Sequence, residues 1–166
     1  SIRDAPSVVP PDPWPGDPLR GDAIRAGRYE FAGHSVASAS PPWVAADDDT
    51  HPSHWRRALN EFAWLRDLRA LGGNEARQVA RLLTLGWIEH HRQWSWPAWR
   101  ADTIALRIVA WLTHYDVFFA SADDSFRRSL MTSIGRQIRH LIRILPAEVD
   151  GAARITALKG LICGAV

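Results

Sequence analysis

The stretch from Trp87 to Trp111, WIEHHRQWSWPAWRADTIALRIVAW, decides how the fold of this chain is interpreted. It contains five tryptophans and two adjacent histidines, and Pro97 interrupts it near the middle. Proline breaks a helix interior, so the stretch predicts a helix end, a connection and a new helix start. Indole rings suit both a packed core and a surface that stacks on sugar rings. We expect about three in four of them in the core, because large aromatic residues are mostly buried.

On both sides of this stretch, apolar residues recur at three- and four-residue steps, the spacing of one helix face. The first predicted helix starts at the N-cap Ser53 and closes at the glycine pair Gly72–Gly73, and Asn74 caps the second. The four predicted helices span about 53–71, 74–91, 100–119 and 123–145, and a fifth starts after Gly151. Their predicted core comprises Phe62, Leu65, Leu83, Trp87, Ile108, Trp111, Ile134, Ile138 and Leu141.

Residues 1–50 differ from the rest because they hold most of the prolines, which exclude a continuous helix. Between the proline clusters, residues 27–36 (GRYEFAGHSV) alternate in part and are bounded by glycine, which indicates a short strand or hairpin. We therefore predict a proline-rich extended arm over 1–50 that packs on a helical body over 51–166. The last residues are an uncapped apolar run, which predicts a chain cut inside its fifth helix.

The composition excludes several classes of protein. The hydrophobic fraction of 46% and charged fraction of 23% are typical of one globular domain, and no run reaches the roughly 20 apolar residues of a membrane span. Lys159 is the sole lysine, and there is no basic run, no zinc-ligand spacing and no glycine-rich phosphate loop. We expect no nucleic-acid partner, no membrane partner and no cofactor. Cys163 cannot form an internal disulfide and is predicted to be a small buried residue.

Successive helices joined by short connections lie antiparallel, so the body is predicted to be mainly α, a row of helical hairpins. The periodicity leaves three arrangements open: a bundle, an irregular solenoid or an arc of an α/α toroid. His90 and His91 are predicted not to form a metal site, since adjacent helical residues point about 100° apart.

Six segments, in order, resemble the N-terminal region of bacterial heparinase II/III-like proteins. They are DPWPGD (12–17), FAWLRDLRALGG (62–73), WIEHHRQW (87–94), WRADTIALRIVAWL (99–112), FRRSLMTSIGRQIRHLIRILP (126–146) and ALKGLICGAV (157–166). The resemblance covers essentially the whole chain. Ala101 departs from the family pattern, in which proline is common at this position.

The resemblance implies a polysaccharide lyase whose N-terminal α/α toroid precedes β-sandwich modules. Such lyases cleave uronic-acid polymers by β-elimination, which requires neutralising the carboxylate before a base removes the C5 proton. The family's Gly-Gly-His motif does not occur here, so we assign no catalytic residue to this chain. An anionic polysaccharide is the implied ligand, the remaining C-terminal part of the protein is a further partner, and a periplasmic location follows only by family analogy.

Four residues are candidates for contact with substrate: Trp99, Arg107, Trp111 and His114. Arg107, Trp111 and His114 share one side of the third predicted helix, and Trp99 stands at its entrance. An arginine beside indoles offers charge for a carboxylate and a flat face for a sugar ring. The alternative is structural, with Trp111 in the core and Arg107 tying helices together.

Two hypotheses for function follow. In the first, the chain is the N-terminal part of a lyase and is inactive by itself. In the second, it is a non-catalytic helical scaffold or partner-binding module. A downstream Gly-Gly-His segment, a catalytic tyrosine and a β-rich C-terminal half would separate the two.

Overall fold

The computed structural model describes residues 5–145, 156, 158–160 and 163 of the chain. Within these ranges the protein is mainly α-helical, with one two-stranded antiparallel sheet. The elements are α1 (Pro18–Arg25), β1 (Arg28–Phe31), β2 (His34–Ala37), α2 (Trp43–Asp47), α3 (Ser53–Glu61), α4 (Leu65–Leu71), α5 (Gly73–His90), α6 (Ala101–Thr113), the π-helix η1 (Tyr115–Phe119) and α7 (Asp124–Ile144). Among the described residues, no helix is long and apolar enough to cross a membrane.

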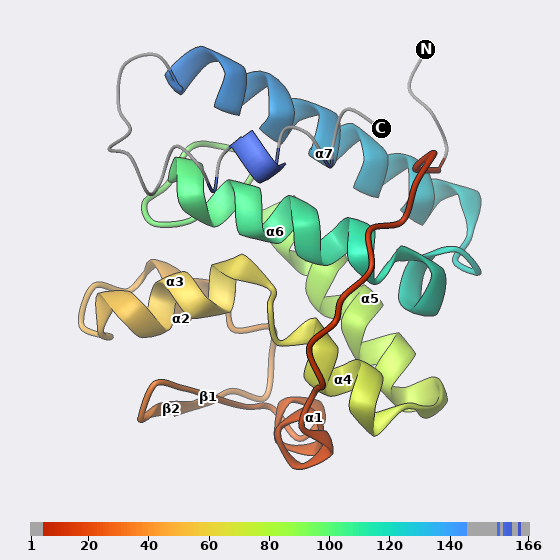
Figure 1. The fold of residues 1–166 in the computed structure, drawn as a ribbon. Helices are drawn as coiled ribbons and strands as arrows, with labels where there is room; N and C mark the ends of the chain where they lie inside the picture. The colour runs from red at the N-terminus through yellow and green to blue at the C-terminus, as the bar shows by residue number, and fades with distance from the viewer. Residues whose placement is uncertain (1–4, 146–155, 157, 161–162, 164–166) are drawn as a thin grey trace.

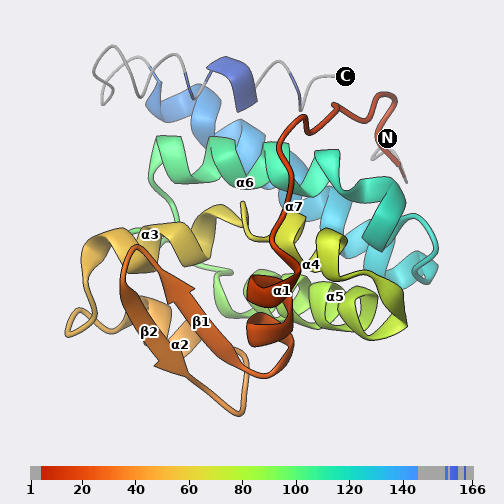
Figure 2. The same ribbon diagram turned by 60° about the horizontal axis from the view of Figure 1, so that its bottom comes forward.

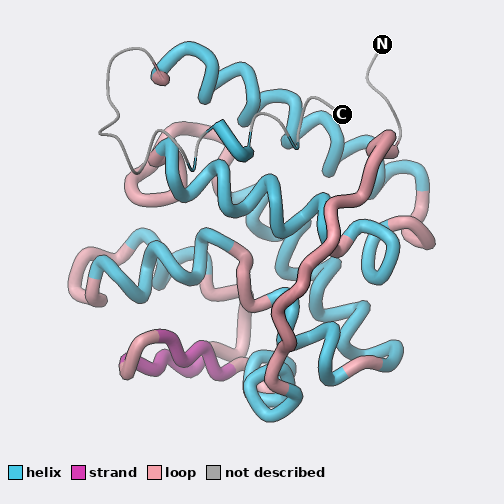
Figure 3. Tube along the Cα trace, in the orientation of Figure 1, coloured by secondary structure: helices cyan, strands magenta, loops and turns pink. Residues whose placement is uncertain are grey.

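Figure 1 shows α6 and α7 side by side and running in opposite directions, with α5 crossing behind them. α3 lies against the other side of α6, and α1 and the hairpin form the far end of the molecule. The segment before α1 runs across these layers from α7 to α1, as the tube in Figure 3 makes clear. Turned by 60°, the molecule shows the β1–β2 hairpin next to α2 and α3 (Figure 2). The predicted antiparallel arrangement is therefore seen for α6 and α7.

The core is a cluster of aromatic rings from several helices. Phe62 packs face to face on Trp43, with ring centroids 5.5 Å apart, and edge-on to Trp111 at 5.2 Å. Trp87 meets Trp111 edge-on at 5.5 Å. Eight of the nine predicted core residues are buried, and Ile138 is half-buried. Residues of the first fifty, Ile24, Tyr29 and Trp43, belong to the same cluster, so the N-terminal stretch shares the core of the helices.

The first predicted helix is two helices, because the chain turns sharply at Phe62. This residue has φ 62° and ψ 12°, a left-handed conformation that costs a non-glycine residue about 1–2 kcal/mol. The turn places its ring, which is fully buried, between Trp43 and Trp111. Burying an aromatic side chain stabilises the fold by more than this backbone conformation costs. The apolar residues therefore keep their three- and four-residue spacing across residues 53–71, although the helix is interrupted at Phe62.

The N-terminal stretch is also more ordered than an extended arm. Its predicted hairpin is confirmed, with Tyr29 opposite Val36. However, the prediction missed helix α1, which starts where the Asp17 carboxylate accepts a hydrogen bond from the Leu19 N–H and Pro18 occupies the first turn. It also missed the short helix α2. α1 packs closely on α4: a Cβ added to Gly21 would lie 2.3 Å from the Asp67 carbonyl oxygen, so only glycine fits.

The remaining helix ends agree with the predicted ones to within a few residues. α5 starts at Gly73 with Gly72 as its N-cap, two residues before the predicted cap Asn74. α6 ends at Thr113, and the π-helix continues the predicted helix to Phe119. The predicted start of the fourth helix near residue 123 is confirmed: Asp123 is the N-cap of α7, and its carboxylate accepts a hydrogen bond from the Phe126 N–H at 2.8 Å. The predicted start of the fifth helix, after Gly151, lies outside the described residues. Cys163 is half-buried.

Candidate functional site

The four residues predicted to contact substrate are all buried. The exposed fractions of Trp99, Arg107, Trp111 and His114 are 5%, 0%, 0% and 2%. Three of them gather around one indole, that of Trp87: its ring lies 6.2 Å from Trp99, 5.5 Å from Trp111 and 3.8 Å from the Arg107 guanidinium carbon. These positions offer almost no surface to a sugar ring. Their contact with a substrate stays a prediction, and the geometry favours the structural alternative.

Arg107 ties three parts of the fold together. Its guanidinium donates hydrogen bonds to the Asn60 carbonyl oxygen at 2.8 Å, the Ala98 carbonyl oxygen at 2.9 Å and Gln137 Oε1 at 2.8 Å. These acceptors belong to α3, to the connection before α6 and to α7. Burial pulls the pKa of Arg107 well below its ordinary value, but an arginine remains protonated in proteins. Each of its three nitrogens donates to a protein oxygen and the side chain is fully buried, so a ligand carboxylate cannot reach the guanidinium.

His114 lies apart from this group, against α4 and the N-terminal segment. Its Nδ1 lies 2.8 Å from the Ala110 carbonyl oxygen, and its Nε2 lies 3.3 Å from Arg69 Nη1 and 3.7 Å from Asp12 Oδ2. The Asp12 side chain, 5% exposed, also pairs with Arg66 at 3.4 Å and Arg69 at 3.2 Å. Burial lowers the pKa of His114, and the charge of Arg69 adds to the shift. His114 therefore helps to hold the segment that precedes α1.

Two indoles of the stretch 87–111 that were not predicted as candidates are exposed. Trp94 and Trp96 lie in the connection between α5 and α6 and are 66% and 39% exposed. The Arg56 guanidinium carbon lies 5.0 Å from the centre of the Trp96 ring. Their position in the sequence could have indicated their exposure, since both lie after the end of α5 and before Pro97, in the connection to α6. A surface that stacks on sugar rings would use these two rings.

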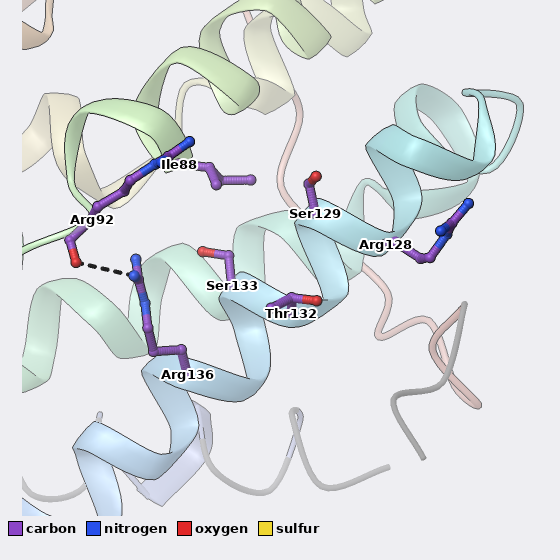
Figure 4. A pocket seen from close by; sticks show the side chains of 7 residues that line it. All are labelled: Ile88, Arg92, Arg128, Ser129, Thr132, Ser133 and Arg136. Carbon is purple, nitrogen blue, oxygen red and sulfur yellow. Dashed lines mark hydrogen bonds between the residues drawn. The ribbon is translucent and has the colours of Figure 1, made fainter.

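A pocket of about 320 Å³ opens between α5 and α7. We call it the arginine pocket; its lining residues are Ile88, Arg92, Arg128, Ser129, Thr132, Ser133 and Arg136. Figure 4 shows Arg92 and Arg136 at one end and Arg128 at the other, with the three hydroxyl side chains between them. Arg136 is fixed there because it donates hydrogen bonds to the carbonyl oxygens of Arg92 at 3.0 Å and His91 at 3.1 Å.

The arginine pocket carries an unbalanced positive charge. None of its seven lining residues is acidic, and among the described residues none of its three arginines forms an ion pair with a carboxylate. Burial lowers the pKa of Arg136, and the charges of Arg92 and Arg139 lower it further. Guanidinium groups beside hydroxyls match the donor pattern that carboxylate, sulfate and phosphate groups accept. The pocket is therefore suited to an anionic group, a feature that helix periodicity alone does not reveal.

The structure brings Asp47, His90 and His91 together, in contrast to the prediction for the two histidines. Their potential ligand atoms all lie within 4.8 Å of one another. The two rings were expected to point apart because both histidines were treated as helical, whereas His91 is the C-cap of α5, with φ −99° and ψ 42°. The change in backbone direction brings the two imidazole rings to a centroid separation of 4.8 Å.

Comparison with known proteins gives one similarity and two negative results. No protein-family model matches the chain, and no solved structure matches it significantly. The chain is 30% identical over 100 residues to FtsZ-localized protein C of Caulobacter vibrioides. This similarity covers 60% of the chain and 17% of that protein, so the chain corresponds to a small part of its relative.

Proposed function

We propose that the chain is the N-terminal helical arc of an α/α toroid in a longer heparinase II/III-like protein, and that it binds acidic groups of a uronate-containing polysaccharide. The six resembling segments support the family, and the antiparallel packing of α6 on α7 suits a toroid arc. In this role the chain contributes binding surface and rigidity. The reaction itself belongs to residues beyond this chain.

The arginine pocket is the observation that carries the proposal. Arg92 and Arg128 are exposed, Arg136 is held in place by two backbone carbonyls, and hydroxyl groups line the floor between them. The exposed indoles of Trp94 and Trp96 follow Arg92 in the chain and add flat faces for sugar rings. Contacts of this kind are screened by ions, so binding is expected to weaken as salt is added.

The test measures affinity for alginate and heparin oligosaccharides by calorimetry at two salt concentrations. Replacing Arg92 or Arg128 by Gln is expected to weaken binding by up to about fivefold, the range that exposed ion pairs give. Arg28→Gln, which removes an exposed arginine of β1, is the matched control and should leave affinity unchanged. Equal weakening by all three substitutions would show that only net charge matters and would reject the pocket as the site.

The lyase part of the proposal is tested by product formation. β-Elimination leaves an unsaturated uronate that absorbs in the ultraviolet, so turnover can be followed directly on alginate, heparin, heparan sulfate and hyaluronan. We expect no turnover by the 166-residue chain and turnover of at least one polymer by the full-length protein, because proton abstraction needs a base from the downstream part. Turnover by the short chain would place the catalytic groups within it.

A second candidate function is a partner-binding scaffold, and the similarity to an FtsZ-localized protein favours it. In this case the helical surface of the chain contributes to association with FtsZ. The test is sedimentation of the chain with assembled FtsZ, with unassembled FtsZ as the control. Recovery of the chain in the pellet only with assembled FtsZ would support the scaffold. A chain that stays in the supernatant throughout would remove this candidate.

A further inference from the structure

The cluster formed by Asp47, His90 and His91 lies where the C-terminal ends of α2 and α5 meet. His90 Nε2 lies 2.7 Å from Asp47 Oδ2, and His91 Nε2 lies 3.5 Å from Asp47 Oδ1. One carboxylate thus faces both imidazoles, one oxygen toward each ring. The His91 side chain is fully buried, whereas those of His90 and Asp47 are 31% and 37% exposed. The cluster is therefore buried on the side of His91 and accessible to solvent on the side of His90 and Asp47.

His91 presents an unused nitrogen to the carboxylate. Its Nδ1 lies 3.3 Å from the Trp87 carbonyl oxygen, an acceptor that assigns the ring proton to Nδ1. Nε2 then carries the lone pair, is buried and has no hydrogen-bond partner among the described residues. A lone pair and a carboxylate oxygen, both acceptors, therefore face each other, and this arrangement is completed by a cation between them.

The packing around His91 fixes this orientation. The imidazole stacks on Trp87 at a centroid distance of 4.7 Å and meets Trp43 edge-on at 6.0 Å. Trp43 and Asp47 are one helical turn apart on α2, so the indole that packs on His91 also positions the carboxylate. A hydrogen bond from one imidazole nitrogen to a backbone carbonyl, with the other nitrogen directed at the ion, is the usual arrangement of histidine ligands.

We propose that Asp47, His90 and His91 bind a divalent transition-metal ion of the Zn²⁺ type, which links α2 to the end of α5. Two imidazoles and a carboxylate are ligands that Zn²⁺ prefers, and three protein ligands leave the exposed side open for a water molecule. Bonds of about 2.1 Å in a tetrahedral site place ligand atoms roughly 3.4 Å apart, close to the 3.5 Å between His91 Nε2 and Asp47 Oδ1. The His90–Asp47 pair must widen, and the partial exposure of both side chains leaves them room to do so.

The competing explanation is that the three residues form only a hydrogen-bonded pin between α2 and α5. A hydrogen bond between His90 Nε2 and Asp47 Oδ2, which lie 2.7 Å apart, is enough for such a pin. The pin does not use the lone pair of His91, however, whereas a metal ion does. The two explanations also predict different responses to Zn²⁺, because a hydrogen-bonded pin would neither bind the ion nor gain stability from it.

The experiment titrates the metal-free 166-residue chain with ZnCl₂ by calorimetry and repeats the titration with Co²⁺, whose visible absorption reports the coordination geometry. We expect one equivalent to bind and the melting temperature to rise, since a ligand that binds only the folded state stabilises it. Asp47→Asn and His90→Gln should each weaken Zn²⁺ binding by at least about tenfold, because even the loss of an outer-shell partner has an effect of this size. Both positions are partly exposed, so both variants are expected to fold.

Two matched controls separate the cluster from general binding by acids and histidines. Asp49→Asn removes an exposed carboxylate two residues from Asp47, and His51→Gln removes a member of the other close histidine pair, in which His34 Nε2 lies 3.2 Å from His51 Nδ1. Both should retain the affinity of the parent. No binding by the parent would overturn the proposal and leave the pin, and so would equal affinity of the parent and Asp47→Asn. Loss of binding in His51→Gln alone would move the site to the other pair.

Discussion

Arg107 and the three arginines of the arginine pocket all lie on or beside α7, but their surroundings differ. Arg107 is enclosed by helices, lies over the Trp87 ring and spends every guanidinium nitrogen on protein oxygens. The arginines of the arginine pocket face an opening, and Arg136 is held by two backbone carbonyls. An arginine next to indoles therefore does not by itself define a binding site. What decides is whether its donors are already satisfied by the fold.

The largest expected effect is on the free energy of unfolding, which should fall when a buried indole is removed and hardly change when an exposed indole is removed. Replacing Trp87 by Ala removes a fully buried ring and its hydrogen bond to Asn60 Oδ1, and it should lower the free energy of unfolding by about 3–5 kcal/mol. Trp94→Ala removes a ring that is 66% exposed and should change it by less than about 0.5 kcal/mol. Urea unfolding monitored by circular dichroism measures both. Similar losses of unfolding free energy in the two variants would show that the buried and the exposed indole do not differ in their contribution to stability.

The next effect contrasts the arginines themselves. Arg107→Met keeps much of the side-chain volume but leaves three buried oxygens without a donor, and it should cost about 2–4 kcal/mol of unfolding free energy. Arg128→Met, at an exposed position of the arginine pocket, should stay within about 0.5 kcal/mol. The same unfolding measurements apply. If Arg107→Met were neutral, the three hydrogen bonds would be replaceable and Arg107 could not be called a tie.

The smallest effect concerns the dependence of stability on pH. The pKa of His114 is lowered from its ordinary value of 6.5, so the unfolded state binds a proton more readily than the folded state. Stability should then fall as the pH drops below about 6.5, by up to about 1.4 kcal/mol per pH unit. His114→Gln should flatten this slope in melting curves recorded between about pH 7.5 and 5.5. An unchanged slope would mean that His114 is not the group that titrates.

Periodicity predicted most of the helices because burial on one face leaves a pattern in the sequence. It also predicted that Trp111 lies in the core and that a helix starts near residue 123, both of which the structure confirms. It could not predict the break at Phe62, since the apolar spacing runs on while the backbone turns. Helix α1 was missed because prolines outweighed the capping sequence Asp17–Pro18.

The candidate sites were harder to predict, because they depend on contacts between distant residues. Sequence spacing placed Arg107 and Trp111 on one side of α6, but nothing in the spacing shows that Asn60, Ala98 and Gln137 occupy the guanidinium. Likewise, the arginine pocket joins α5 to α7, which lie about forty residues apart in the chain. The carboxylate that faces His90 and His91 comes from Asp47, more than forty residues earlier.

The segment that precedes α1 is attached through partners far along the chain. Asp12 meets Arg66 and Arg69, 54 and 57 residues later, and also approaches His114. Contacts of such long sequence separation carry a large loop-closure cost, so we expect this segment to dock late during folding. It is also the first part expected to detach in native-state fluctuations, and its amide hydrogens should exchange faster than those of α5 and α6. Detachment would uncover the ends of α4 and α6 while the aromatic core stays intact.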